Sequence, residues 1–214
     1  MKKLYLSIIA VLLVSILIFS GCDLFDDEDV AAVIAAATPA ISVGSTLTLT
    51  GTITHVFVPD TLQWAANYSS VGNNYVLISE HDDSTLATDI GGNADLNLSY
   101  GTPTADMLDN PTDAGYTSSN SNARILTVHV EESGQAGQIT NGYYANPYQW
   151  YSYLYSTHDT IINGVYTDGD GDTYTVNNGS ISAGWNWIIT STSNGSNFTY
   201  SGGTISSPMW TYSD

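Results

Sequence analysis

From about residue 43 onward, short stretches of alternating apolar and polar residues are separated by clusters of Gly, Asn, Asp and Ser. Alternation with a period of two places the apolar side chains on one face of a β-strand. The apolar positions that share a face are Leu47, Leu49, Ile53 and Phe57; Leu96, Leu98 and Tyr100; and Leu126, Val128 and Val130, while Tyr75 to Ser79 is one continuous apolar run. With scarcely any helix-forming stretch between these runs, the pattern predicts an all-β body over residues 43–214.

The last third of the chain has the most regular pattern. Strands are predicted over 160–167, 173–177, 180–192, 197–200 and 204–212. Asn178-Gly179 and Asn194-Gly195 suit the left-handed conformations of two-residue hairpin turns. We therefore expect a C-terminal up-and-down meander within an antiparallel β-sandwich or barrel, with a candidate seam between two smaller β units near 132–142.

Two polar segments, 82–94 and 102–122, are long enough to be loops on this scaffold. Binding residues are often found on loops that a rigid sheet holds in place. Both segments are therefore candidate binding regions, and flexible loops are the alternative.

The N-terminus has the layout of an export signal. Lys2 and Lys3 precede an apolar run from Leu4 to Phe19, and small residues follow before Cys22. The run has 16 residues, fewer than the roughly 20 that a membrane-spanning helix needs. A signal peptide over residues 1–21 is therefore favoured over an uncleaved anchor.

Phe19-Ser20-Gly21-Cys22 resembles the lipobox of bacterial lipoproteins, in the looser form of spirochaete-like lipoproteins, with Phe19 where Leu is usual. The resemblance implies cleavage before Cys22, diacylglycerol on its sulfur and a further acyl chain, such as palmitate, on its amine. Two or more chains make membrane anchoring stable. The expected location is the bacterial cell envelope outside the cytoplasm, with the outer membrane or cell surface favoured over the inner membrane.

A second, shorter resemblance concerns the body. Asn163-Gly164-Val165-Tyr166, the acidic segment 168–172 and Asn178-Gly179 are similar to a hairpin of small calycin-like β-barrel lipoproteins. This resemblance implies a barrel but covers few residues, so sandwich and barrel both remain open.

Removal of residues 1–21 would leave Arg124 as the one Lys or Arg against 21 Asp and Glu, a net charge of about −20. Such a field repels phosphate backbones, which excludes nucleic-acid binding. Divalent cations or cationic partners are the natural counter-charges, and general solubility in a salty habitat is the alternative. The acidic and alanine-rich segment 22–42 is interpreted as a tether between lipid and body.

Asp168, Asp170 and Asp172 alternate with glycines, as do the first ligands of a calcium loop. No carboxylate follows between Thr173 and Ile205, so a calcium ion would need backbone oxygens, water and a remote acid. The alternative, which we favour, is an ordinary hairpin loop of Asp and Gly.

Aromatic residues are concentrated between Tyr143 and Tyr155. On a strand, Tyr151, Tyr153 and Tyr155 share one face and Trp150 lies on the other. An exposed row of rings would bind carbohydrate or a protein partner, and the alternative is that one face belongs to the core. These four residues are the candidate ligand-binding residues.

Catalytic patterns give little guidance. The chain has no G-x-S-x-G, H-E-x-x-H, P-loop or G-x-G-x-x-G motif. Of the four histidines, His81 beside Asp82 and Asp83 is a candidate metal ligand, while His55 and His129 lie within predicted strands. No catalytic residue is assigned, and a non-enzymatic role is favoured.

The sequence thus predicts an acylated extracytoplasmic lipoprotein that acts as a carbohydrate- or protein-binding module. A structural or surface-coat lipoprotein and a hydrolase of an extracellular polymer are the alternatives.

Overall fold

The computed structural model describes residues 40–58, 63–67, 74–89, 94–113, 115–135, 137–144, 147–167, 171–193 and 196–213. The segment Ala37–Asp214 forms one compact unit. The predicted signal peptide over residues 1–21 and residues 22–39 of the expected tether, Cys22 included, lie outside the described residues.

The protein is all-β, as predicted. In chain order the strands are β1 (Ile41–Gly44), β2 (Leu47–Val58), β3 (Gln63–Asn67), β4 (Tyr75–Ser79), β5 (Thr85–Asp89), β6 (Asp95–Tyr100), β7 (Tyr116–Ser118), β8 (Ile125–Glu132), β9 (Gln138–Tyr144), β10 (Tyr148–Ser156), β11 (Thr160–Thr167), β12 (Thr173–Ile181), β13 (Gly184–Thr192), β14 (Asn197–Ser201) and β15 (Met209–Ser213). A single 3-10 turn, η2 (Ala105–Met107), precedes β7 in the described chain. No apolar helix of membrane-spanning length occurs in the described part of the chain.

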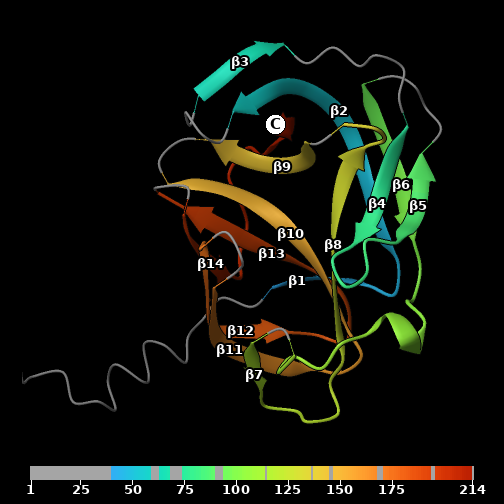
Figure 1. Cartoon of the computed structure of the whole chain (residues 1–214), viewed down its shortest axis with the longest axis vertical. Helices are drawn as coiled ribbons and strands as arrows, with labels where there is room; N and C mark the ends of the chain where they lie inside the picture. Colours follow the sequence, from blue (N-terminus) through green and yellow to red (C-terminus); the bar gives the residue numbers. More distant parts are fainter. Residues whose placement is uncertain are drawn as a thin grey trace, which may run out of the picture. The chain divides into compact units, whose positions relative to one another are not determined.

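Hydrogen-bonded neighbours follow the order β3-β2-β15-β9-β8-β10-β13-β14-β12-β11-β7, and β1, β4, β5 and β6 branch from this path (Figure 1). Most pairs are antiparallel, but β12 with β14 and β15 with β2 are parallel. Across the expected seam, β8 pairs with β9 through Val130 and Ile139, so strand pairing continues there.

The C-terminal strands differ from a simple meander because β14 lies between β12 and β13. Asn178-Gly179, predicted as a turn, lies inside β12, where Gly179 pairs with Ile162. The chain turns instead before Gly184, where the buried Asn186 side chain bonds the Ser182 amide and the Ser182 and Gly184 carbonyls. An amide side chain that replaces backbone partners in this way specifies a turn.

Strands β10 and β13 form the central wall of the sheet. Their register runs without interruption from Tyr148 opposite Thr192 to Ser156 opposite Gly184. On one face, Tyr151 and Tyr153 pack beside Trp187, with ring centroids 5.0 and 5.7 Å apart, in the main core with Trp185. On the other face, Leu154 and Ile188 belong to a second cluster. A strand pair buried on both faces explains why apolar residues occupy both parities of β13.

Strand β2 changes its pairing partner just after Gly51. Residues up to Thr52 pair with β6, and Ile53 pairs with Trp210 of β15. The Trp210 indole lies directly over Gly51 and donates a hydrogen bond of 2.9 Å to the Thr50 carbonyl oxygen. A Cβ at position 51 would lie 2.1 Å from Trp210 Cδ1, so only glycine permits this approach.

We therefore expect Gly51→Ala to lower the free energy of unfolding by about 2–3 kcal/mol through overpacking. Chemical denaturation of both proteins would measure the difference. Gly101→Ala is the matched control, because a Cβ there meets no atom within 4 Å. A loss in Gly51→Ala no larger than in Gly101→Ala would contradict the steric argument.

Candidate functional site

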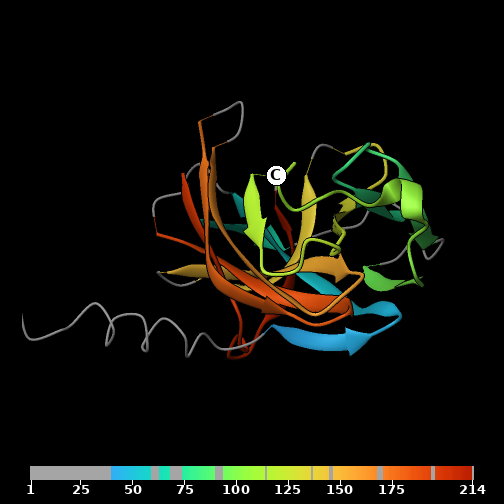
Figure 2. The same cartoon turned by 90° about the horizontal axis from the view of Figure 1, so that it is seen from below.

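A cavity of about 690 Å³ lies against the second face of the β10–β13 wall. Strands β11, β12 and β14 curl beyond this wall (Figure 2). Side chains from β7 to β14 line the cavity, together with Glu80, His81, Asp109 and Asp113. The volume falls within the roughly 300–1,000 Å³ of small-molecule sites.

One end of the cavity is closed by aliphatic side chains. Ile125, Leu154, Ile162, Val176 and Ile188 line it and form the second core cluster. They come from five strands, and in four of these a residue two positions away along the same strand also lines the cavity: Thr127 of β8, Ser152 of β10, Tyr174 of β12 and Thr190 of β13. Because alternate residues of a strand share a face, these four strands place an aliphatic side chain at the floor of the cavity and a polar or aromatic side chain next to it.

Aromatic side chains form one wall. Tyr174 stacks with Phe198 at a centroid distance of 4.8 Å and with Tyr200 at 6.0 Å. Trp150 contacts Phe198 edge-on with ring centroids 5.9 Å apart, and the ring centroids of Tyr166 and Tyr174 are 6.3 Å apart. The parallel register of β12 and β14 sets Tyr174 directly opposite Phe198, so the inserted strand β14 creates this wall.

Hydroxyl groups occupy the middle of the cavity. Ser152 and Thr190 are cross-strand neighbours on β10 and β13, and their side-chain oxygens are 2.6 Å apart. Thr127 of β8 and Thr140 of β9 also line the cavity. These groups can donate or accept hydrogen bonds to a polar ligand.

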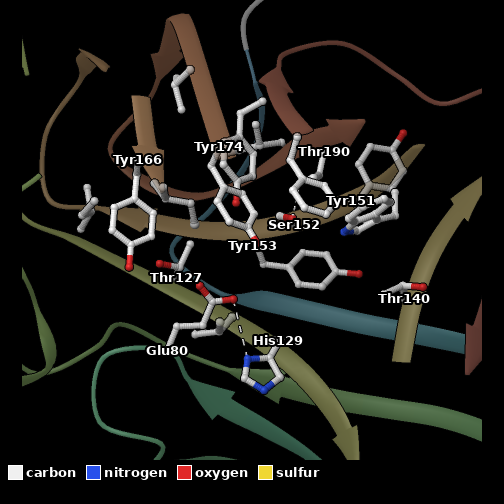
Figure 3. A pocket seen from close by; sticks show the side chains of 18 of the residues that line it. Glu80, Thr127, His129, Thr140, Tyr151, Ser152, Tyr153, Tyr166, Tyr174 and Thr190 are labelled. Carbon is white, nitrogen blue, oxygen red and sulfur yellow. Dashed lines mark hydrogen bonds and ion pairs between the residues drawn. The ribbon is translucent and has the colours of Figure 1, made fainter. Parts of the chain in front are cut away.

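The opposite side carries carboxylates and histidines. His129 Nε2 lies 2.9 Å from Glu131 Oε1, and His129 Nδ1 lies 3.7 Å from Glu80 Oε1. Figure 3 shows Glu80 and His129 across from Tyr166 and Tyr174. Burial opposes protonation of His129, but Glu80 and Glu131 outweigh it and raise the pKa of His129 above 6.5.

The hydroxyl groups of Tyr116 and Tyr200 stay neutral near physiological pH. Burial, aided by the negative charge of Glu80, raises the pKa of Tyr116 to about 12. Burial, with contributions from Tyr116 and Glu80, also raises the pKa of Tyr200 well above 10. Both phenols therefore serve as neutral hydrogen-bonding groups.

The aromatic row predicted on β10 is divided between the two faces of the sheet. Tyr151 and Tyr153 are only 5% and 2% exposed, and Tyr155 packs against the main core. They do not form an exposed platform, because this face of β10 is covered by the main core, although Tyr151 and Tyr153 border the cavity. Trp150, on the other face, lies in the aromatic wall.

Asp168 and Asp170 lie outside the described residues, and Asp172 is half-buried. Within the described chain, no group of three His, Cys, Asp or Glu is arranged to hold a metal ion. His81 instead pairs with Asp109, with Nδ1 and Oδ2 2.7 Å apart.

Sequence reasoning missed most of the cavity. Part of the segment expected to be loop over 102–122 forms η2 and β7 and supplies Asp109, Asp113 and Tyr116; the 82–94 segment contains β5. One signal was available: Phe198 and Tyr200, like Tyr174 and Val176, are two residues apart, which indicates that each pair lies on the same face of its strand. The placement of β14 beside β12 had no local signal.

Comparison of the chain with protein-family models, with curated proteins and with solved structures found no match. The cavity is therefore interpreted from its own geometry.

The raised pKa of His129 predicts a pH-dependent contribution to stability. Because the pKa is higher in the folded protein, this contribution is complete below about pH 6.5 and is lost as pH rises through the folded-state value. Urea denaturation near pH 5.5 and near pH 8.5 should show a larger loss for His129→Gln at the lower pH. His158→Gln, at an exposed histidine, is the control, and a loss for His129→Gln equal at both pH values would contradict the pairing.

Proposed function

We propose that this protein is a lipid-anchored lipoprotein of the bacterial envelope that binds carbohydrate in the aromatic cavity. One observation carries the proposal. An aromatic wall of Trp150, Phe198 and Tyr174 lies on one side of the cavity, with hydroxyl groups in the middle and carboxylates on the other side. Sugars present apolar C–H surfaces and many hydroxyls at once. Aromatic rings match the first, and neutral hydroxyls and carboxylates match the second.

The charge of the cavity supports the same class of ligand. Its described lining contains Glu80, Asp109 and Asp113 but no Lys or Arg. The two histidines of the described lining, His81 and His129, already pair with Asp109 and Glu131, so an anionic ligand would meet negative charge at a cost in free energy. A neutral or positively charged polyhydroxylated ligand avoids this cost.

The envelope location is proposed on the N-terminal sequence. The signal-like segment 1–21 and the lipobox-like residues before Cys22 support acylation. Two or three acyl chains give stable membrane binding, at about 0.8 kcal/mol per buried methylene. The binding unit would then be held outside the cytoplasm, where extracellular glycans are available.

Mass spectrometry of the protein from its native host should find a mature N-terminus that begins at acylated Cys22. Cys22→Ser should abolish the lipid mass and move the protein from the membrane fraction to the soluble or unprocessed fraction. An intact Met1, or an unlipidated cleavage site elsewhere, would contradict the lipoprotein proposal.

If carbohydrate binds in the cavity, truncation of a ring in the aromatic wall should lower the affinity for it. A glycan array probed with the detergent-solubilised protein should yield a binding glycan, and Trp150→Ala should weaken its affinity at least about tenfold, because stacking and packing contacts of one large ring are lost. Titration calorimetry with that glycan would measure the change.

Tyr143→Ala is the matched control, since Tyr143 is 44% exposed and is not part of the cavity lining. Equal affinities of Trp150→Ala and Tyr143→Ala would place glycan binding elsewhere. Absence of binding to every glycan on the array would overturn the proposed function.

A further inference from the structure

The carboxylates beside the cavity differ in which protein groups already compensate their negative charge. Asp109 lies 2.7 Å from His81, and Glu131 lies 2.9 Å from His129. Asp113 accepts a hydrogen bond of 2.9 Å from the Asn110 amide. Each of these three has a partner at hydrogen-bond distance.

Glu80 is the exception. Its nearest basic atom is His129 Nδ1 at 3.7 Å, too far for a hydrogen bond, and His129 is already held by Glu131. Within the described residues, no donor lies within hydrogen-bond distance of the Glu80 carboxylate. With 47% of its side chain exposed, the carboxylate can bind a ligand group in competition only with this long ion pair to His129.

The surroundings of Glu80 favour a cation. Its charge acts across the cavity on the Tyr116 and Tyr200 phenols and disfavours their ionisation. Neutral phenols and ring π-systems both interact favourably with an ammonium group. The group is also surrounded by a chain of net charge −18, so a positive ligand is favoured at longer range as well.

We infer that Glu80 binds a protonated amine of the ligand, so that the cavity selects amino sugars over neutral sugars. This inference rests on the proposed carbohydrate function and adds its chemical class. The ring of the sugar lies against the aromatic wall, and its ammonium group replaces water at Glu80. Of the two histidines in the described lining, His81 is paired with Asp109, and His129, when protonated, competes for the Glu80 carboxylate.

Two trisaccharides of the same linkage test this selectivity. Cellotriose and the glucosamine trimer differ only in an amino group that replaces one hydroxyl on each ring. Titration calorimetry with the detergent-solubilised lipidated protein, near neutral pH and at low salt, should find the glucosamine trimer bound about three- to tenfold more tightly, the range of a partly exposed charge pair. Added salt should reduce this preference.

Glu80→Gln should remove most of the preference for the glucosamine trimer and leave only the smaller part that the long-range negative field supplies. Asp83→Asn is the matched control: it removes the same charge three residues away, Asp83 is exposed and outside the cavity lining, and Asn tolerates its positive φ of 58°. This control should keep the preference. Unchanged thermal unfolding of both variants would show that each remains folded.

A glucosamine trimer that binds no more tightly than cellotriose, or a preference that is undiminished in Glu80→Gln, would overturn the inference and leave the carbohydrate proposal standing. The same holds if the glucosamine trimer does not bind while other glycans do. If no glycan binds at all, the proposed function fails and this inference fails with it.

Discussion

The β10–β13 ladder is the contact on which the rest of the structure depends. Its two strands are paired over their whole length, and both faces are covered: one by the main core around Trp185, the other by the aliphatic floor of the cavity. Trp185 is fully buried, and its indole donates a hydrogen bond of 2.8 Å to the Gly101 carbonyl oxygen. Because this wall is fixed from one side by close packing, the other side can remain hollow without loss of order.

The hollow side owes its chemistry to one topological feature, the insertion of β14 between β12 and β13. A meander would have paired β12 with β13 directly. The parallel pairing of β12 with β14 instead brings Tyr174, Phe198 and Tyr200 into one stack. Glu80 and His129 lie across the cavity from Tyr174 (Figure 3), so the cavity has two chemically different sides.

Acidic charge has both a general and a local role. The excess of Asp and Glu over Lys and Arg gives the whole surface a negative field. At the cavity most carboxylates are locally compensated by histidine or amide donors, and only Glu80 is held at a longer distance. Selectivity for a cation would therefore depend mainly on one weakly compensated group, with a smaller contribution from net charge.

The sequence by itself determined the strand content and much of the core, because a period of two is a local property. The parity of Leu47, Leu49 and Ile53, the run Tyr75 to Ser79 and the segment 160–167 all agree with the structure. Only the tertiary structure decided which strands are neighbours and which faces are covered, since pairing joins residues far apart in the chain. It buried Tyr151 and Tyr153, placed Trp150 in the cavity and brought Glu80 near Tyr116 and Tyr200, because strand order, which no local pattern encodes, sets these distances.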